Sequence, residues 1–212
     1  MPTLLALLLC ALLVHAPAAA SAPLAVRTAH HAIPDDFPLL DGYPPDRRAE
    51  DDGYGRHGPS RTMKPLRFDA CGRQVGAPRG VERLRGGWTN PEDFRERELL
   101  AFRTADRAQG YVRGVLHLFA ACPEDGPRDD RRSTTVAHRT ITTTYAYRGT
   151  PRPGIQVTHM VRVGTAVLLA TTYNEGGAGS HPEQEAAAER RRTAREIEDV
   201  VEAMARFRTT PK

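Results

Sequence analysis

A cysteine at the end of an amphipathic helix is the feature of this sequence that most restricts the fold. Residues 96–102 alternate as in a strand, and from Ala105 the apolar positions recur every three or four residues up to Cys122, which is the spacing of one helix face. Thr104 can cap this helix, and Pro123 ends it just past the cysteine. The cysteine therefore lies at the end of the buried face, where it can be bridged to a strand.

The start of the chain decides which cysteines remain to form that bridge. Residues 1–22 contain an apolar core followed by small residues. The core is too short for a membrane span, which needs about 20 apolar residues, and it suits a secretory signal peptide. We expect Cys10 to be lost with this peptide, and Cys71 and Cys122 to form one disulfide in an oxidising compartment. A redox or metal-binding pair is the less favoured alternative, because the sequence has no C-x-x-C.

A leader rich in Pro and Gly is expected to precede the folded domain. Residues 23–62 have no sustained periodicity and are predicted to be irregular, with disorder between Asp46 and Pro59. The apolar side chains within residues 33–40 are enough to dock this leader in part. The domain itself is expected to span residues 63–208.

Strand patterns lie on both sides of the predicted helix. Alternation predicts short strands over residues 65–71 and 81–88, and a high content of Thr, Ile, Val and Tyr predicts one long strand over residues 134–147. The clearest pattern is a hairpin over residues 155–173 with a two-residue turn at 164–165. The resulting register pairs Val163 with Ala166, Val161 with Leu168, His159 with Ala170, and Val157 with Thr172.

This register divides the hairpin into two faces. One face is apolar except for His159 and is expected to lie under helices, with His159 as a core histidine rather than a catalytic base. The other face mixes polar and apolar residues and could form a ligand-binding cleft, although an ordinary exposed face explains it at least as well. Its Arg162 could meet an anionic ligand group or join a surface ion pair. The candidate ligand contacts are Thr158, Met160, Arg162, Leu169 and Tyr173.

A second amphipathic helix is predicted near the end of the chain. Ser180, Pro182 and Glu183 form a helix start, and apolar residues then recur at helical spacing through a charged background up to Phe207. Its apolar face is expected to pack against the sheet rather than to lie on a membrane.

Composition and motifs argue against several functions. The formal net charge is +4, but the arginines are interleaved with acidic residues, so no nucleic-acid partner is expected. The sequence has no G-x-S-x-G, H-E-x-x-H, P-loop or G-x-G-x-x-G motif. Glu96 and Glu98 could mimic an acid pair, but the neighbouring arginines favour solvated ion pairs. No catalytic residue, cofactor or metal is therefore expected.

The order of these elements resembles one family. Six elements carry the resemblance: the strand ending in Cys71, the E-L-L-A-F strand, the T-A-D-R-A helix start, the A-A-C-P helix end, the H-M-V-R-V-G-T-A-V-L-L hairpin and the charged last helix. In order and spacing they are similar to the extracytoplasmic sensor domain of PknH-type receptor serine/threonine kinases. This family includes free-standing secreted relatives in actinobacteria. The resemblance spans residues 63–207. It implies an α+β fold, in which a twisted antiparallel sheet is packed by two main helices, and a cleft for an unidentified ligand. The family often has two disulfides, whereas Cys71 and Cys122 supply only one.

The expected function is a secreted or cell-envelope-associated ligand-binding or sensor-like module without catalytic activity. We expect no membrane-spanning segment after signal removal, so signalling would need a membrane partner, and a soluble carrier is equally plausible. A second possibility is a structural or interaction protein that binds anionic wall polymers, and a third is a secreted hydrolase. Salt-sensitive binding to wall material would favour the second, and a saturable thermal shift with a small molecule would favour the first.

Overall fold

The computed structural model describes residues 32–44, 54–122, 131–137, 139–146, 154–176 and 179–208. The expected signal peptide lies outside these ranges. Within them, no helix has the length and apolar character needed to cross a membrane. The elements in chain order are β1 (Gly55–Ser60), β2 (Arg67–Ala70), β3 (Arg73–Gly76), β4 (Glu82–Thr89), β5 (Asp93–Ala101), α1 (Ala105–Ala120), β6 (Arg131–Ala137), β7 (Thr140–Ala146), β8 (Ile155–Val163), β9 (Ala166–Asn174), α2 (Pro182–Glu196), α3 (Glu198–Ala203) and a 3₁₀ turn, η1 (Met204–Phe207).

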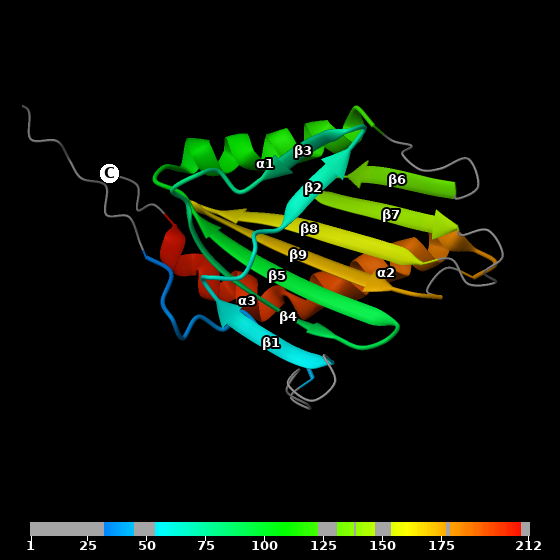
Figure 1. Ribbon diagram of the computed structural model, residues 1–212, viewed down its shortest axis with the longest axis horizontal. Helices are drawn as coiled ribbons and strands as arrows, with labels where there is room; N and C mark the ends of the chain where they lie inside the picture. The colour runs from blue at the N-terminus through cyan, green and yellow to red at the C-terminus, as the bar shows by residue number, and fades with distance from the viewer. Residues whose placement is uncertain are drawn as a thin grey trace, which may run out of the picture.

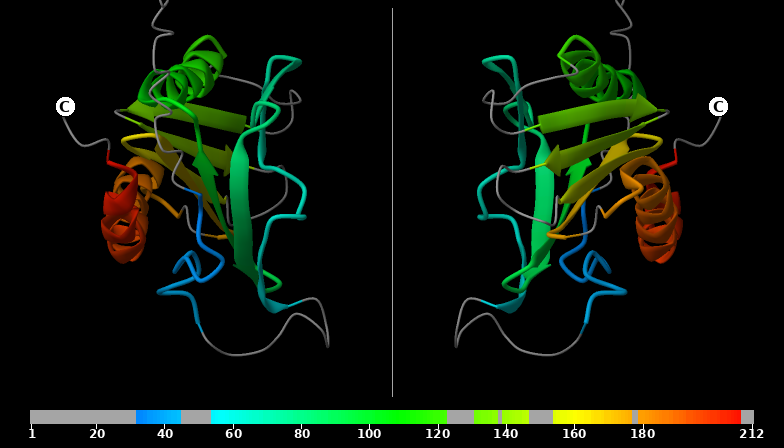
Figure 2. Two further views of the ribbon diagram at one scale, coloured as in Figure 1. Left: turned by 90° about the vertical axis from the view of Figure 1, so that its left-hand side faces the viewer. Right: turned by 90° about the vertical axis from the view of Figure 1, so that its right-hand side faces the viewer.

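One antiparallel sheet organises these elements. Seven strands pair in the order β1-β4-β5-β9-β8-β7-β6, while β2 and β3 form a separate hairpin (Figure 1). The strand direction turns progressively across the sheet, which is therefore strongly twisted (Figure 2). The predicted α+β class, a twisted antiparallel sheet packed by helices, is confirmed.

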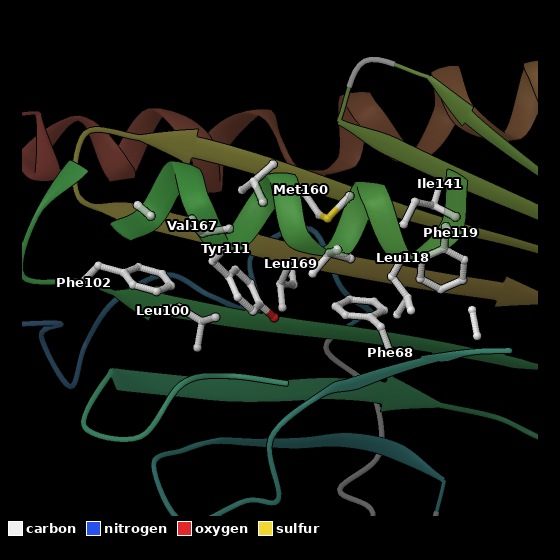
Figure 3. Close-up of a cluster of buried hydrophobic side chains, with 14 of the residues drawn as sticks. Phe68, Leu100, Phe102, Tyr111, Leu118, Phe119, Ile141, Met160, Val167 and Leu169 are labelled. Atoms are coloured by element: carbon white, nitrogen blue, oxygen red, sulfur yellow. The ribbon is translucent and has the colours of Figure 1, made fainter. Parts of the chain in front are cut away.

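The two faces of the sheet bury separate apolar clusters, because side chains alternate along each strand. One cluster lies under α1 and contains Leu100, Met160 and Leu169, together with Phe68 from β2 (Figure 3). On the other face, α2 covers a small cluster of Ile155, Val157 and Ala186. A larger cluster there lies under α3 and η1. Its buried members are Ile33, Phe37, Leu39, Leu84, Leu99, Ala101, Ala166, Leu168, Ala170, Ile197, Val200, Met204 and Phe207.

The β8–β9 hairpin forms in the predicted register. Val163 lies opposite Ala166, and the pairing continues through His159 and Ala170 to the far end of both strands. Gly164, in the turn, has a φ of 55°, a conformation that glycine adopts without steric cost. The prediction of this hairpin is confirmed.

His159 is a core histidine, as predicted. Its ring nitrogens lie 3.1 Å from Thr140 Oγ1 and 2.7 Å from Thr193 Oγ1. Because Thr193 Oγ1 also donates to the Glu189 carbonyl, this network is satisfied when Thr140 donates to Nδ1 and the neutral ring donates from Nε2. Burial, with a smaller contribution from Arg190, lowers the pKa of His159 to about 4.

Two other predictions about α1 are confirmed. The Thr104 side chain accepts a hydrogen bond from the backbone N–H of Arg107 and so caps the helix. Cys71 and Cys122 form a disulfide with Cα atoms 5.9 Å apart, which joins the β2–β3 hairpin to the end of α1.

The buried side chain of Arg97 connects the leader to the end of α2. Its guanidinium donates to the carbonyls of Leu39, Asp41 and Glu196 at 2.6 to 2.9 Å. The same group lies 4.0 Å from the centre of the Tyr43 ring, in a cation–π contact. The segment around residues 33–43 is thereby held against the sheet.

Three sequence predictions were wrong in detail. The single long strand over residues 134–147 is instead the β6–β7 hairpin, which turns at Arg139 with a φ of 71°. Residues 55–60, predicted to be irregular, form edge strand β1 because β4 supplies its hydrogen-bonding partner. The single last helix is interrupted at Ile197, where α2 gives way to α3 and η1.

Candidate functional site

The structure does not bring the five predicted contacts of the hairpin together in one open cleft. Met160 and Leu169 are 0 % exposed and lie under α1 (Figure 3). Thr158 is also buried, and its hydroxyl lies 3.0 Å from that of Thr171. The expected half-covered face is fully covered at these positions, and a ligand could reach them only if α1 moved away.

The remaining two residues lie at opposite ends of the hairpin. Arg162 donates to the Gly164 carbonyl at 3.0 Å and so supports the turn. Tyr173 stacks on Phe94 with 5.4 Å between ring centres. Tyr173 lies six positions along β9 from Val167, the partner of Arg162, so the two ends lie roughly 20 Å apart. They cannot contact one small ligand together, and ligand contact by either residue remains a prediction.

A pocket of about 460 Å³ lies instead where β5 ends and α1 begins, at the left of the molecule in Figure 1. This volume falls in the usual range for small-molecule sites, about 300 to 1,000 Å³. The pocket is lined by Pro78, Arg79, Gly80, Val81, Phe102, Arg103, Arg107 and Tyr111.

Strand pairing and helix geometry bring these distant residues together. Glu82 pairs with Ala101 at the edge of the β4–β5 ladder, so Val81 and Phe102, one position further along each strand, become neighbours. Arg107 and Tyr111 are four residues apart on α1 and therefore share a helix face. The pocket is thus built from the β3–β4 connection, the β5–α1 connection and the first turns of α1.

The mouth of this pocket is positively charged. Arg79, Arg103 and Arg107 are exposed, and none of the three guanidinium groups forms an ion pair within the part of the chain that the structure describes. The N-terminal end of α1 adds a partial positive charge from its aligned peptide dipoles.

The wall of the pocket is aromatic. Phe102 and Tyr111 are buried, with 5.6 Å between their ring centres. Burial and the nearby Glu98 carboxyl both raise the pKa of Tyr111, so its hydroxyl stays protonated. That hydroxyl points away from Phe102 (Figure 3), and it has no hydrogen-bond partner among the described residues.

Glu98, close to Tyr111, is the buried acid that the sequence did not reveal. It is 0 % exposed; its Oε2 accepts a hydrogen bond from the Leu66 N–H at 3.0 Å, and its Oε1 has no partner among the described residues. Burial raises its pKa to about 7. The prediction of a solvated ion pair was wrong for Glu98, because the chain leading into β2 lies over it.

Glu96, two residues earlier, does form ion pairs. It contacts His57 at 2.9 Å and Arg85 at 3.1 Å. Although burial opposes ionisation, these two partners lower the pKa of Glu96, while its hydrogen bond raises the pKa of His57. Glu96 is therefore ion-paired as predicted, but its partners are His57 and Arg85 rather than the neighbouring arginines of its own strand, and the site is partly buried rather than solvated.

A second hollow, of about 380 Å³, lies between β7 and α2. It is lined by Thr135, Thr142, Thr144, Pro182, Glu183, Ala186 and Arg190. Its arginine, Arg190, already donates to Thr142, at 3.4 Å, and the lining also includes the carboxylate of Glu183. The described lining of this hollow thus has one positive and one negative side chain, and it lacks the excess positive charge of the α1 pocket. In the described ranges no group of three or more His, Cys, Asp or Glu side chains could hold a metal ion.

Comparisons with known proteins give limited information. No family model and no curated protein matches the chain. Among solved structures, the extracellular domain of PknH from Mycobacterium tuberculosis matches with a TM-score of 0.38 and 15 % identity, over 57 % of this chain and 64 % of that one. The chain thus spans somewhat less than two thirds of that domain. The similarity to PknH-type sensor domains is a weak resemblance of fold, and any function has to be argued from the residues of the site.

Proposed function

We propose that the protein is a non-catalytic binding module that works outside the cytoplasm and takes a small ligand in the pocket at the start of α1. The observation that carries this proposal is the convergence of three arginines, which form no ion pair with any described residue, on a pocket of about 460 Å³ with an aromatic wall. The Cys71–Cys122 disulfide supports an oxidising compartment. We further propose that residues 63–208, together with strand β1 and the docked segment 33–43, form the sensor-like domain and that residues 1–22 direct its export.

The chemistry of the lining favours binding over catalysis. Among the described residues, the titratable side chains of the lining are three arginines and Tyr111, none of which is a general base active near neutral pH. Glu98, with a pKa of about 7, is 0 % exposed and is not part of this lining. His57 is bonded to Glu96 and to no described hydroxyl or thiol. Of the two hydroxyls that contact His159, that of Thr193 is buried and that of Thr140 is half-buried, and the low pKa of the His159 ring makes it a weak base.

A ligand screen by thermal shift tests the proposal. A ligand at about 100 times its Kd stabilises the folded state by roughly 2.7 kcal/mol, a readily measured rise in Tm. Val81→Trp places a large side chain in the pocket. Val201→Trp makes the same change on α3, outside the lining. We expect the ligand-induced shift to disappear in the first variant and to persist in the second.

Two outcomes would contradict this assignment. A shift that survives in Val81→Trp would place the ligand elsewhere. A shift lost in Tyr173→Ala but kept in Val81→Trp would point to the aromatic end of the hairpin, the other candidate site.

A further inference from the structure

Three positive side chains reach the mouth of the α1 pocket from three different segments. Arg79 belongs to the β3–β4 connection, Arg103 to the β5–α1 connection, and Arg107 to the first turn of α1. Like charges brought into one mouth repel each other unless an anion lies between them. Asp106 is also in the first turn, but it does not line the pocket. Among the lining residues that the structure describes, no carboxylate could neutralise the three arginines.

Arginine is well suited to an oxyanion. Its planar guanidinium can donate two parallel hydrogen bonds to a carboxylate or a phosphate. The first backbone N–H groups and the dipole of α1 favour negative charge at the same place. Thr104 already accepts from the Arg107 N–H, so the side chains, rather than that amide, would hold the anion.

The interior of the pocket favours an apolar group. Val81 and Pro78 lie on the connection before β4, and the rings of Phe102 and Tyr111 form the wall behind them. Transfer of an apolar body from water to this wall is favourable in proportion to the area it buries. A charged mouth in front of an apolar wall is complementary to a molecule with one charged end and one apolar end.

From this arrangement we infer that the ligand is an amphiphilic oxyanion, a carboxylate or phosphate group joined to a compact apolar body. The inference rests on the proposed function and specifies the ligand class of the same pocket. Arg103 and Arg107 select the charge, and Phe102 with Val81 accommodates the apolar body.

The test compares probes that share one body and differ in charge. 2-Naphthoate and 2-naphthyl phosphate are the anionic probes, and 2-naphthamide is their neutral counterpart. Dissociation constants are measured by calorimetry on the full mature chain. We expect at least one anion to bind about tenfold or more tightly than the amide, with an affinity that falls as salt is added. The stronger of the two anions identifies the head group.

Paired charge variants assign this preference to the pocket. In an Arg103→Gln, Arg107→Gln double variant, only Arg79 of the three arginines remains, so the preference for the anion over the amide should fall severalfold. Arg113→Gln removes a positive charge from the exposed face of the same helix, outside the lining, and should leave the preference unchanged. Far-UV circular dichroism and Tm establish that each variant is folded.

The possible failures are distinguishable. If anion and amide bind equally to the wild-type chain and Val81→Trp abolishes both, the pocket binds ligands but the inference about charge is wrong. If neither anion binds at millimolar concentration, or if Arg113→Gln loses as much preference as the double variant, the inference is also overturned. Binding that persists in Val81→Trp refutes the proposed site itself.

Discussion

Two buried side chains make opposite contributions to the pH dependence of stability. Burial raises the pKa of Glu98 from 4.5 to about 7, so its stabilising contribution is fully present below pH 4.5 and is lost as the pH rises through 7. Burial and Arg190 lower the pKa of His159 from 6.5 to about 4. The contribution of His159 is therefore fully present above pH 6.5 and is lost as the pH falls towards 4.

The two contributions should nearly cancel in the wild-type chain. Each pKa differs by roughly 2.5 units between the folded and unfolded states, which corresponds to about 3 kcal/mol in the free energy of unfolding. Between about pH 6.5 and 4.5, protonation of Glu98 stabilises the folded state, while protonation of His159 in the unfolded state opposes it. In a variant that lacks one of the two groups, the contribution of the other group to the pH dependence of stability should become measurable.

Glu98→Gln is the perturbation that separates them. Glutamine keeps an oxygen that can accept from the Leu66 N–H but removes the titration. We expect the free energy of unfolding of this variant, relative to wild type, to be higher by up to about 3 kcal/mol near pH 8 and to lose this advantage by about pH 4.5. Urea unfolding, followed by the fluorescence of Trp88, measures both chains across this range.

Two control variants are measured by urea unfolding over the same pH range. Glu202→Gln, an exposed position on α3, should parallel wild type. His159→Gln should show the opposite trend, with stability relative to wild type improving as the pH falls. If Glu98→Gln parallels wild type to within about 0.5 kcal/mol over the whole range, Glu98 is not buried as an acid and the reasoning fails.

Three other changes test the contacts that hold the fold together. Replacing both Cys71 and Cys122 by serine opens a 51-residue loop and should lower the free energy of unfolding by about 4 kcal/mol, whereas equal stability of oxidised and reduced wild type would contradict this. Gly164→Ala puts a Cβ 1.8 Å from a backbone oxygen at a φ of 55° and should cost about 2 kcal/mol or more in urea unfolding; Gly114→Ala, with open space around it, should not destabilise. Arg97→Met leaves three backbone carbonyls without their donor and should cost about 3 kcal/mol in the same assay; an unchanged midpoint would show that those bonds contribute nothing.

The most accurate sequence predictions concern elements whose pattern is local and periodic. In the β8–β9 hairpin, a one-residue slip would move the whole apolar set to the other face, so alternation and Gly164 together identify the register. The same argument placed His159 among apolar residues. Helix α1 was equally accessible because its apolar spacing, its Thr104 cap and the terminal Cys122 agree.

The wrong predictions arise where neighbours in space override local composition. Arg139 turns the chain between β6 and β7 without the glycine or asparagine that usually marks such a turn. Strand β1 forms because β4 offers it hydrogen bonds, although its own residues are poor strand formers. The interruption at Ile197 leaves the apolar spacing almost unchanged and so has no clear sequence signal.

The candidate site was the least predictable feature. The mixed face of the hairpin is polar and apolar in sequence, but whether a helix covers it depends on where α1 packs, and α1 buries Met160 and Leu169. The α1 pocket joins Arg79 to Arg107 across 28 positions of the chain, and no periodicity links them. Glu98 and Glu96 occupy equivalent positions in one alternating pattern. Glu98 is buried because the chain before β2 lies over it.

The periodic features could be predicted from local pattern alone: the register of the β8–β9 hairpin, the capped amphipathic helix α1, and the bridge from its end, Cys122, to Cys71. These follow from side-chain alternation and helical repeat, which are properties of neighbouring residues. Three features became known from the folded chain: the face of the sheet that each helix covers, the burial of Glu98, and the meeting of Arg79, Arg103 and Arg107 at one pocket. These features depend on how segments far apart in the chain pack together. The burial of a side chain and the charges around it are set by its neighbours in space, which a local sequence pattern does not contain.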